Sequence, residues 1–188
     1  MKHLIIASSS KRREQILRNH GIKFKISPSN IAEDRFNHLN PIKMVETLSF
    51  LKAKKAFEKF PNSIILGADT TVVLGKKILG KPKSSTEAYK MLKSLSGKTH
   101  KVITGFTITN SSDGKTLTSH EITKVTFRKL SEEEINNYVG HGEVMDKAGA
   151  YAIQEEAGEF VEKIEGDYLN VVGLPSKVFD HLKSFGIA

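Results

Sequence analysis

The chain has 188 residues, of which 38% are hydrophobic and 27% are charged, and it contains no cysteine. This length and composition predict one globular domain with a sizeable core, and the lack of cysteine excludes disulfides, thiolate metal sites and a cysteine nucleophile. The apolar run near the N-terminus is too short for a secretory signal, and no later run is long enough to span a bilayer. The sequence therefore predicts a cytoplasmic protein.

The net charge of +8 conceals an asymmetry along the chain. Residues 1–131 carry 25 Lys and Arg against 9 Asp and Glu, whereas residues 132–167 carry 2 against 11. A basic part beside an acidic part suggests a polyanionic ligand held near carboxylates, as in a metal-bound phosphate. Nucleic acid is the weaker interpretation, because the chain has no zinc finger, aromatic-rich strand or sustained basic helix. A solvated lysine-rich surface is the plainest explanation for most of these charges.

The first elements predicted are a strand at residues 4–7, a serine run at 8–10, and a helix that ends near Gly21. This arrangement binds phosphate in many proteins, because backbone N–H groups and hydroxyls donate to the anion. Arg12 and Arg13 would add positive charge there. The alternative is that one serine only caps the helix and the arginines are solvated. The pattern leaves both interpretations open.

A second strand is predicted at residues 22–26, and Asn40-Pro41 opens a long helix with a cap and a proline at its first position. Glu33 falls in the polar loop between them. On this helix Lys52 lies on the apolar face, whereas Lys54 lies on the polar face. Lys52 either spreads its stem over the core with its ammonium in water or aims the ammonium into a cleft. Spacing does not choose between these alternatives.

The most informative stretch is GADTTVVLGKKILGKP, residues 67–82. Residues 63–66 are predicted to form a short buried strand that Gly67 ends, which places Asp69 just past the strand end. The chain then returns through a hairpin to Lys81, so a carboxylate and a lysine are presented from neighbouring strand ends, where ligands bind in open α/β sheets. The alternative is a plain hairpin in which Asp69 caps a turn.

The second half of the chain contains capping boxes, runs rich in Thr, Val, Ile and Phe, and a late proline. These patterns predict two helices that follow Ser84 and Ser131, an antiparallel pair of strands at 99–109 and 116–128, strands at 159–164 and 168–172, and a last helix beyond Pro175.

Six motifs then follow one another along the chain: ASSSKRREQIL, FLKAKKA, GADTTVVLGKKILGKP, LSGKTHKVITG, MDKAGAYAIQ and KIEGDYLNVVGLP. Together they resemble, from end to end, the Maf family of nucleotide pyrophosphatases, the septum formation inhibitor proteins. The resemblance implies an α/β fold with an elongated mixed β-sheet, flanking helices and a deep central cleft, similar to the inosine triphosphate pyrophosphatases. It implies one domain over residues 1–188, with two lobes around that cleft.

The resemblance also implies hydrolysis of dTTP and UTP to the monophosphate and pyrophosphate with Mg²⁺ or Mn²⁺, a homodimer, and a connection with arrest of cell division. Asp69 matches the family's proton acceptor and, with Glu33, is the expected metal-binding pair. The other site residues that it implies are the charged shell of Lys52 and Lys81, the phosphate motif residues Ser8, Ser10 and Arg13, and the specificity positions Arg12, Thr70 and Gln154.

The chemistry of these residue types agrees with this assignment. A metal-bound triphosphate needs carboxylates for the cation and basic side chains for the remaining oxygens. Hydrolysis needs a positioned base, for which Asp69 is the candidate. Gln154 carries one amide acceptor and one amide donor, which match O4 and N3–H of uracil or thymine. The chain departs from the family pattern at Lys11, at Ala152 and at residues 155–158, and the last of these borders Gln154.

Two alternatives stay open at this point. One keeps the chemistry and changes the substrate to a purine or modified nucleotide. The other is a non-catalytic basic protein that associates with nucleic acid and regulates septum formation. The second would bind DNA with a steep salt dependence and turn over no nucleotide.

Overall fold

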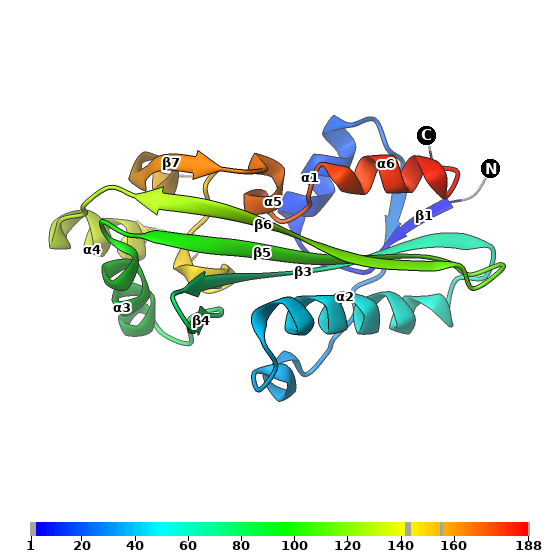
Figure 1. The fold of residues 1–188 in the computed structure, drawn as a ribbon, viewed down its shortest axis with the longest axis horizontal. Helices are drawn as coiled ribbons and strands as arrows, with labels where there is room; N and C mark the ends of the chain where they lie inside the picture. Colours follow the sequence, from blue (N-terminus) through cyan, green and yellow to red (C-terminus); the bar gives the residue numbers. More distant parts are fainter. Residues whose placement is uncertain (1–2, 142–143, 155, 188) are drawn as a thin grey trace. The chain divides into compact units, whose positions relative to one another are not determined.

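The computed structural model describes residues 3–141, 144–154 and 156–187. Within these residues the chain forms a seven-stranded sheet in the order β2-β1-β3-β5-β6-β7, with β4 paired to β3. The strands are β1 (His3–Ile6), β2 (Phe24–Ile26), β3 (Ser63–Leu74), β4 (Lys77–Leu79), β5 (Thr99–Asn110), β6 (Thr116–Phe127) and β7 (Val161–Glu165). The helices are α1 (Lys11–Asn19), α2 (Pro41–Phe57), α3 (Ser85–Leu95), α4 (Glu132–His141), α5 (Tyr168–Val172) and α6 (Lys177–Ser184), with short 3-10 helices η1 (Glu33–Phe36), η2 (Ala148–Ala150) and η3 (Glu156–Phe160) (Figure 1).

The sheet is mixed, as the family resemblance implies. Strand β1 pairs in parallel with β2 and with β3, whereas β3 pairs with β4 and β6 pairs with β7 in the antiparallel sense. The chain divides into two compact units, one of Met1–Asp69, Thr104–Glu121 and Gly173–Ala188, the other of Thr70–Ile103 and Ile122–Val172. Strands β3, β5 and β6 contribute residues to both units.

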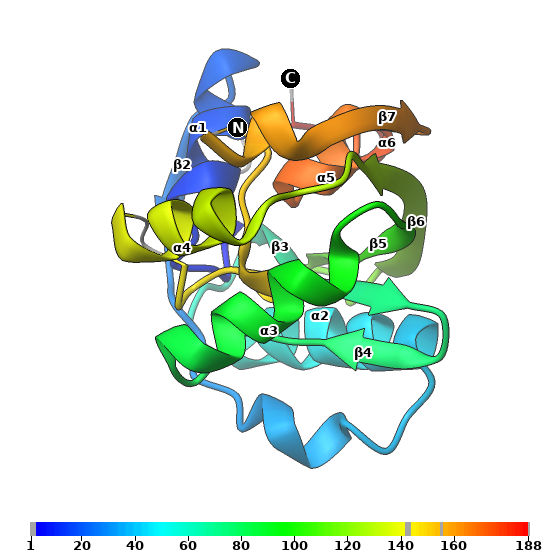
Figure 2. The same ribbon diagram turned by 90° about the vertical axis from the view of Figure 1, so that its left-hand side faces the viewer.

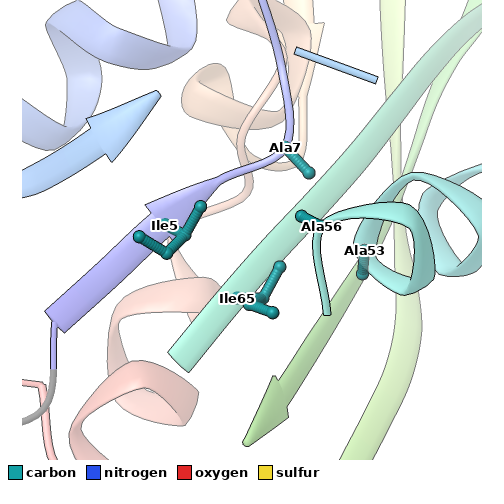
Figure 3. Close-up of a cluster of buried hydrophobic side chains, with 5 residues drawn as sticks. All are labelled: Ile5, Ala7, Ala53, Ala56 and Ile65. Atoms are coloured by element: carbon teal, nitrogen blue, oxygen red, sulfur yellow. The ribbon is translucent and has the colours of Figure 1, made fainter. Parts of the chain in front are cut away.

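The first unit is built around the parallel pair β1 and β3, whose register places Ile5 beside Ile65. Both isoleucines join Ala53 and Ala56 of α2 in one buried cluster (Figure 3). Helix α2 begins as predicted, with Pro41 at its first position and the Asn40 side chain accepting the Lys43 backbone N–H at 2.9 Å. Because helix and strand meet through small side chains here, α2 lies close to the sheet.

Two glycines bring α2 still closer to the sheet. A Cβ at Gly67 on β3 would overlap the Ser49 carbonyl oxygen and lie 2.8 Å from the Ala53 nitrogen. A Cβ at Gly105 on β5 would overlap the carbonyl group of Val45. Neither position leaves room for a side chain, because the helix backbone rests on the strand backbone at both points.

This close contact corrects the prediction that Gly67 ends a short strand. Strand β3 runs through Gly67 without a break, so Asp69 lies in mid-strand and not past a strand end. Glycine is required at position 67 by the helix above it rather than by a turn. Since side chains alternate along a strand, Ile65, Gly67 and Asp69 share the face that α2 covers.

The opposite face of the first unit is covered by α1 and α6 (Figures 1 and 2). Phe106 is the residue after Gly105 and points to this other face, where its ring lies 5.8 Å from that of His181 on α6. Helix α1 ends as predicted, since Gly21 adopts φ of 72° and its N–H bonds to the Arg18 carbonyl at 2.9 Å. The strand predicted at 22–26 forms only over its last three residues, Phe24–Ile26.

The second unit contains α3 and α4, which lie side by side (Figure 2). Both predicted helix caps form: Ser84 accepts the Glu87 N–H at 3.1 Å, and Ser131 accepts the Glu134 N–H at 3.1 Å. The Ser131 box is reciprocal, since Glu134 accepts the Ser131 N–H at 2.8 Å, whereas the Glu87 carboxylate accepts the Lys83 N–H at 2.8 Å. Residues 168–172 are the helix α5 and not the predicted strand. The Asp167 carboxylate accepts the Leu169 N–H at 2.8 Å and so starts a helical turn, which outweighs the strand preference of a valine pair.

No helix within the described residues has the length and apolar character needed to cross a membrane.

Candidate active site

A buried lysine lies between two carboxylates in the first unit. Lys52 extends from α2 until its Nζ is 2.6 Å from Asp69 Oδ1 and 2.7 Å from Glu33 Oε1. Lys52 is 8% exposed and Asp69 7%, whereas the Glu33 side chain, at the start of η1, is 36% exposed. Of the two alternatives left by the sequence, the structure has the ammonium aimed at carboxylates. Lys54 lies on the exposed face of the same helix, as predicted.

The position of this cluster follows from the packing of α2 on β3. Asp69 lies on the strand face that the helix covers, two residues beyond Gly67. With the helix backbone resting on Gly67, the Lys52 stem is long enough for its ammonium to reach the carboxylate. Both carboxylates contact the same nitrogen, so their nearest oxygens lie within roughly two hydrogen-bond lengths of each other.

Arg13 provides a second buried positive charge near the same carboxylates. Burial lowers the pKa of its guanidinium, and the negative charges of Asp69 and Glu33 oppose that lowering. The side chain is held on two sides: Nε donates to the Gly173 carbonyl at 2.8 Å, and Nη1 donates to Ser8 Oγ at 3.1 Å. Arg13 therefore joins the N-terminal serine segment to a residue 160 positions later in the chain.

The serine segment is organised by Ser8 rather than by Ser10. Ser8 Oγ accepts the Ser10 backbone N–H at 3.2 Å as well as the Arg13 bond. Ser10 occupies the position before α1, yet its hydroxyl makes no capping hydrogen bond to the helix. The alternative in which the Ser10 side chain merely caps the helix is therefore wrong. Arg12, on the first turn of α1, is half-buried.

The remaining predicted residues belong to the second unit. Thr70 is half-buried on β3, Lys81 follows β4 and is exposed, and Gln154 is exposed. The Gly149 N–H bonds to the Gly80 carbonyl at 3.0 Å, which attaches the MDKAGAYAIQ segment beside Lys81. The structure thus brings Glu33, Lys52, Asp69, Arg13 and Ser8 together in one unit. That Thr70, Lys81 and Gln154 complete the same site stays a prediction.

Two glycines that shape the site, Gly67 and Gly173, are not recognisable as site residues from the sequence. Gly67 was interpreted as a strand stop, although its position inside a run of β-branched and apolar residues is the signal for a close backbone approach. Gly173 receives the Arg13 bond through its carbonyl and has φ of 123°, a conformation that favours glycine.

The donor set fits a hard divalent cation only in part. Asp69 and Glu33 offer carboxylate oxygens, which Mg²⁺ and Mn²⁺ prefer. Among the described residues, no group of three or more His, Cys, Asp or Glu side chains is placed to hold a metal ion. Mg²⁺ is commonly held by one or two carboxylates together with substrate phosphates, so this pair suits an ion that arrives with a nucleotide.

Comparison with known proteins gives consistent matches over nearly the whole chain. The model of one family, described as Maf-like protein, matches residues 3–185. A dTTP/UTP pyrophosphatase from Thermoanaerobacter sp. (strain X514) is 50% identical over 182 residues, covering 96% of this chain and 95% of the relative. A dTTP/UTP pyrophosphatase from Geobacillus sp. (strain WCH70) is 49% identical over 187 residues, covering 99% and 100%.

Solved structures give weaker matches. A HAM1 protein from Coxiella burnetii is 15% identical, with a TM-score of 0.46 over 69% of this chain and 75% of that chain. The Staphylococcus aureus Ham1 protein is 14% identical, with a TM-score of 0.44 over 67% and 72%.

Proposed function

Because this chain belongs to the Maf-like protein family, we propose that it hydrolyses dTTP and UTP to the nucleoside monophosphate and pyrophosphate. The names of relatives that are about half identical over nearly their full length support the substrate. The observation that carries the chemistry is the buried Lys52 ammonium between Asp69 and Glu33. It puts a candidate base and a second acidic group each within hydrogen-bond reach of one cation.

Asp69 is the proposed general base. In the protein without substrate its Oδ1 accepts a hydrogen bond from Lys52 Nζ at 2.6 Å, which fixes the orientation of the carboxylate. A carboxylate in this state can orient a water molecule for attack on the α-phosphorus and accept its proton. Lys52 and Arg13 carry positive charge beside it and would stabilise the negative charge that develops on the phosphoryl oxygens.

The proposal includes a divalent cation held by Asp69 and Glu33 together with the substrate phosphates. When bound, such an ion neutralises phosphate charge and polarises the phosphoryl group. The residues of the chain have a complementary task. Ser8 and Ser10 with Arg12 and Arg13 would bind the phosphate oxygens, Lys81 would bind the leaving pyrophosphate, and Thr70 and Gln154 would contact the base.

A panel of triphosphates tests the function. We expect purified protein with Mg²⁺ or Mn²⁺ to release pyrophosphate from dTTP and UTP faster than from purine nucleotides, with no release of inorganic phosphate before it. Release from a purine or modified nucleotide at higher kcat/KM would replace the proposed substrate and keep the chemistry. An absence of pyrophosphate from every nucleotide would refute the enzymatic proposal, and salt-dependent DNA binding in that case would favour the non-catalytic alternative.

Base selection is proposed to rest on Gln154. Its amide can pair with O4 and N3–H of uracil or thymine, whereas cytosine presents the reverse donor and acceptor pattern. A fixed amide facing cytosine leaves polar groups unpaired, at about 1–3 kcal/mol each. We expect kcat/KM for UTP to exceed that for CTP by roughly one to two orders of magnitude, and Gln154→Ala to narrow the ratio. Equal values on both nucleotides for the wild type would contradict this assignment.

Further parts of the proposal rest on the family resemblance. They are a single functional domain with two lobes around one cleft, a homodimer, a cytoplasmic location, and a role in nucleotide-pool maintenance that extends to cell division. Sedimentation of the purified protein tests the homodimer, and comparison of cells that carry the wild type or the Asp69→Asn variant tests whether any division phenotype depends on catalysis.

A further inference from the structure

The segment that leads to Gln154 is tied down by hydrogen bonds from different elements of the second unit. The Gly149 N–H bonds to the Gly80 carbonyl at 3.0 Å, and the Ala152 N–H bonds to the Tyr138 hydroxyl of α4 at 3.3 Å. Between these two points, the Tyr151 hydroxyl lies 2.7 Å from His100 Nε2 on β5. Gln154 itself is exposed, so its position depends on how firmly the buried residues before it are held.

The backbone of this segment is strained. Ala150 adopts φ of 63° although it is not a glycine, and it is fully buried. A conformation of this kind costs on the order of 1–3 kcal/mol and persists only where the surroundings determine it. The next residue is Tyr151, whose side chain makes the bond to His100. The strained conformation and the bond therefore occur at adjacent positions, four and three residues before Gln154.

The contact between His100 and Tyr151 is enclosed. His100 is 1% exposed and Tyr151 6%, and the Phe127 ring meets both edge-on, with centroids 5.0 and 4.9 Å away. Burial lowers the pKa of His100 to about 4 and raises the pKa of Tyr151. Both groups are consequently neutral near neutral pH, and the bond joins an uncharged imidazole to an uncharged phenol.

The direction of this bond follows from the count of unsatisfied groups. His100 Nδ1 has no hydrogen-bond partner among the described residues. If Nε2 carried the imidazole proton, both the phenol proton and the bare Nδ1 would be left unpaired. If Tyr151 donates to a bare Nε2, only the Nδ1–H is unpaired. Since each unpaired buried group costs about 1–3 kcal/mol, the second arrangement is favoured.

We propose that His100 and Tyr151 are positioning residues for nucleobase selection: their buried hydrogen bond fixes the strained backbone at Ala150–Tyr151 and thereby the place from which Gln154 meets the base. The inference rests on the proposed function and on the role assigned there to Gln154. Neither residue touches the nucleotide. An amide can discriminate uracil from cytosine only when its backbone is held, because a mobile amide would turn to suit either base.

The test is the UTP-to-CTP ratio of kcat/KM in Tyr151→Phe, which removes the hydroxyl and keeps the ring. We expect the ratio to fall about three- to tenfold, the range that loss of one buried hydrogen bond gives. The change should lie mainly in KM, since Lys52 and Asp69 are untouched. His100→Phe removes the acceptor and should lower the ratio in the same way. The double variant should lower it no further than either single change, because both remove one bond.

Two controls separate positioning from general damage. Tyr89→Phe removes a hydroxyl from α3 of the second unit, where Tyr89 interacts with Lys93 and Glu132 and takes no part in the bond between His100 and Tyr151, and it should leave the ratio unchanged. Phe160→Leu loosens the same aromatic cluster, where Phe160 meets Phe127 and Tyr138, without removing the bond. It should lower the melting temperature and leave the ratio within about twofold of wild type.

Three outcomes would overturn the inference. The first is an unchanged ratio in Tyr151→Phe in a protein whose wild type prefers UTP, which leaves the proposed function standing. The second is a ratio that Phe160→Leu lowers as much as Tyr151→Phe does, which assigns the effect to stability. The third is a wild type that releases no pyrophosphate or does not distinguish UTP from CTP, which overturns the proposed function or its base selection as well.

Discussion

The Lys52 ammonium is shared by two carboxylates, and Arg13 is a second positive charge beside them. Removing charges from water is costly unless they are paired, and here two negative groups depend on Lys52 with Arg13 nearby. An arriving triphosphate would compete for the two cations. Each carboxylate would then become available for a metal ion or a water molecule. The arrangement therefore suits a site that exchanges internal ion pairs for contacts with substrate.

Asp69→Asn tests the base directly. The amide keeps the shape of the side chain but can neither accept a proton nor carry full charge. We expect kcat on dTTP to fall by roughly 10²-fold or more, the contribution of a positioned base, with an unchanged circular dichroism spectrum. Steady-state kinetics on the purified variant provide the measurement. Activity within a few-fold of wild type would exclude Asp69 as the base.

Two lysines on one helix form a matched pair of variants. Lys52→Ala removes the buried ammonium and should reduce kcat strongly, whereas Lys54→Ala removes an exposed charge and should change stability by less than about 0.5 kcal/mol and leave turnover unaffected. Both variants replace a lysine of α2 by alanine, so the change in helix propensity is the same in the two and cancels in the comparison. Similar kinetics in the two variants would show that the contacts of Lys52 are only structural.

At the scale of elements, the distance between α2 and the sheet sets the geometry of the site. That distance is fixed by backbone contact at Gly67 and Gly105 and not by interlocking side chains. A side chain at either position would push the helix outward or bend the strand. Because Lys52 is carried by the helix and Asp69 by the strand, such a shift would separate the two groups.

Gly67→Ala should therefore affect both stability and catalysis. Overpacking of this kind costs about 1–3 kcal/mol, and we expect kcat to fall at least tenfold in the fraction that remains folded. Gly140→Ala is the control, since a Cβ there meets nothing within 4 Å. It should keep full activity and, on the helix α4, gain slightly in stability. A Gly67→Ala protein with normal melting temperature and kcat would show that the helix can move without consequence.

How much of this could be predicted from the sequence differs between elements. The starts of α2, α3 and α4 were predictable because their caps are local: Asn40, Ser84 and Ser131 each bond to a backbone group three residues ahead. Two features were not predictable: that β3 continues unbroken through Gly67, and that residues 168–172 form a helix. Gly67 is explained by a helix distant in the sequence, and Asn170, whose amide bonds to Val102 and Thr123, anchors α5 through partners about 50 or more positions away.

The candidate site likewise combines features that local sequence predicts with features that depend on distant residues. Helical spacing placed Lys52 on the apolar face, but its partner Glu33 comes from a loop with no periodicity, and only the resemblance to a family pointed to it. Of the two Arg13 contacts, the one to Ser8 is local, because Ser8 lies only five residues away in the sequence. The Gly173 carbonyl carries no side-chain signal at all. Long-range backbone contacts of this type leave no pattern in one sequence.

At the scale of the whole molecule, the buried His100 makes stability depend on pH. Its pKa is lowered to about 4 by burial, from an ordinary value of 6.5. In the unfolded chain the His100 imidazole therefore binds a proton below pH 6.5, whereas in the folded chain it stays neutral down to about pH 4. Stability must fall as pH decreases through this window, by about 3 kcal/mol from this residue.

Urea unfolding at pH 7 and at pH 5 measures this contribution. The double variant His100→Phe/Tyr151→Phe lacks the titrating group and keeps the packing volume, so its stability should fall less between the two pH values than that of the wild type. The other histidines and the carboxylates are common to both proteins and cancel in the difference. Equal losses in the two proteins would mean that His100 is already protonated, or accessible to water, in the folded state.

The bond from Arg13 to Gly173 has a consequence for the order in which the protein acquires its activity during synthesis. Translation delivers Ser8 and Arg13 first, and later Glu33, Lys52 and Asp69. The Gly173 carbonyl, which accepts the Arg13 bond, is made 160 residues after the arginine. While the ribosome still encloses Gly173, the arginine lacks the partner that sets its position beside the carboxylates. A nascent chain should therefore remain inert toward nucleotides until Gly173 has left the ribosome, however complete the rest of the site is by then.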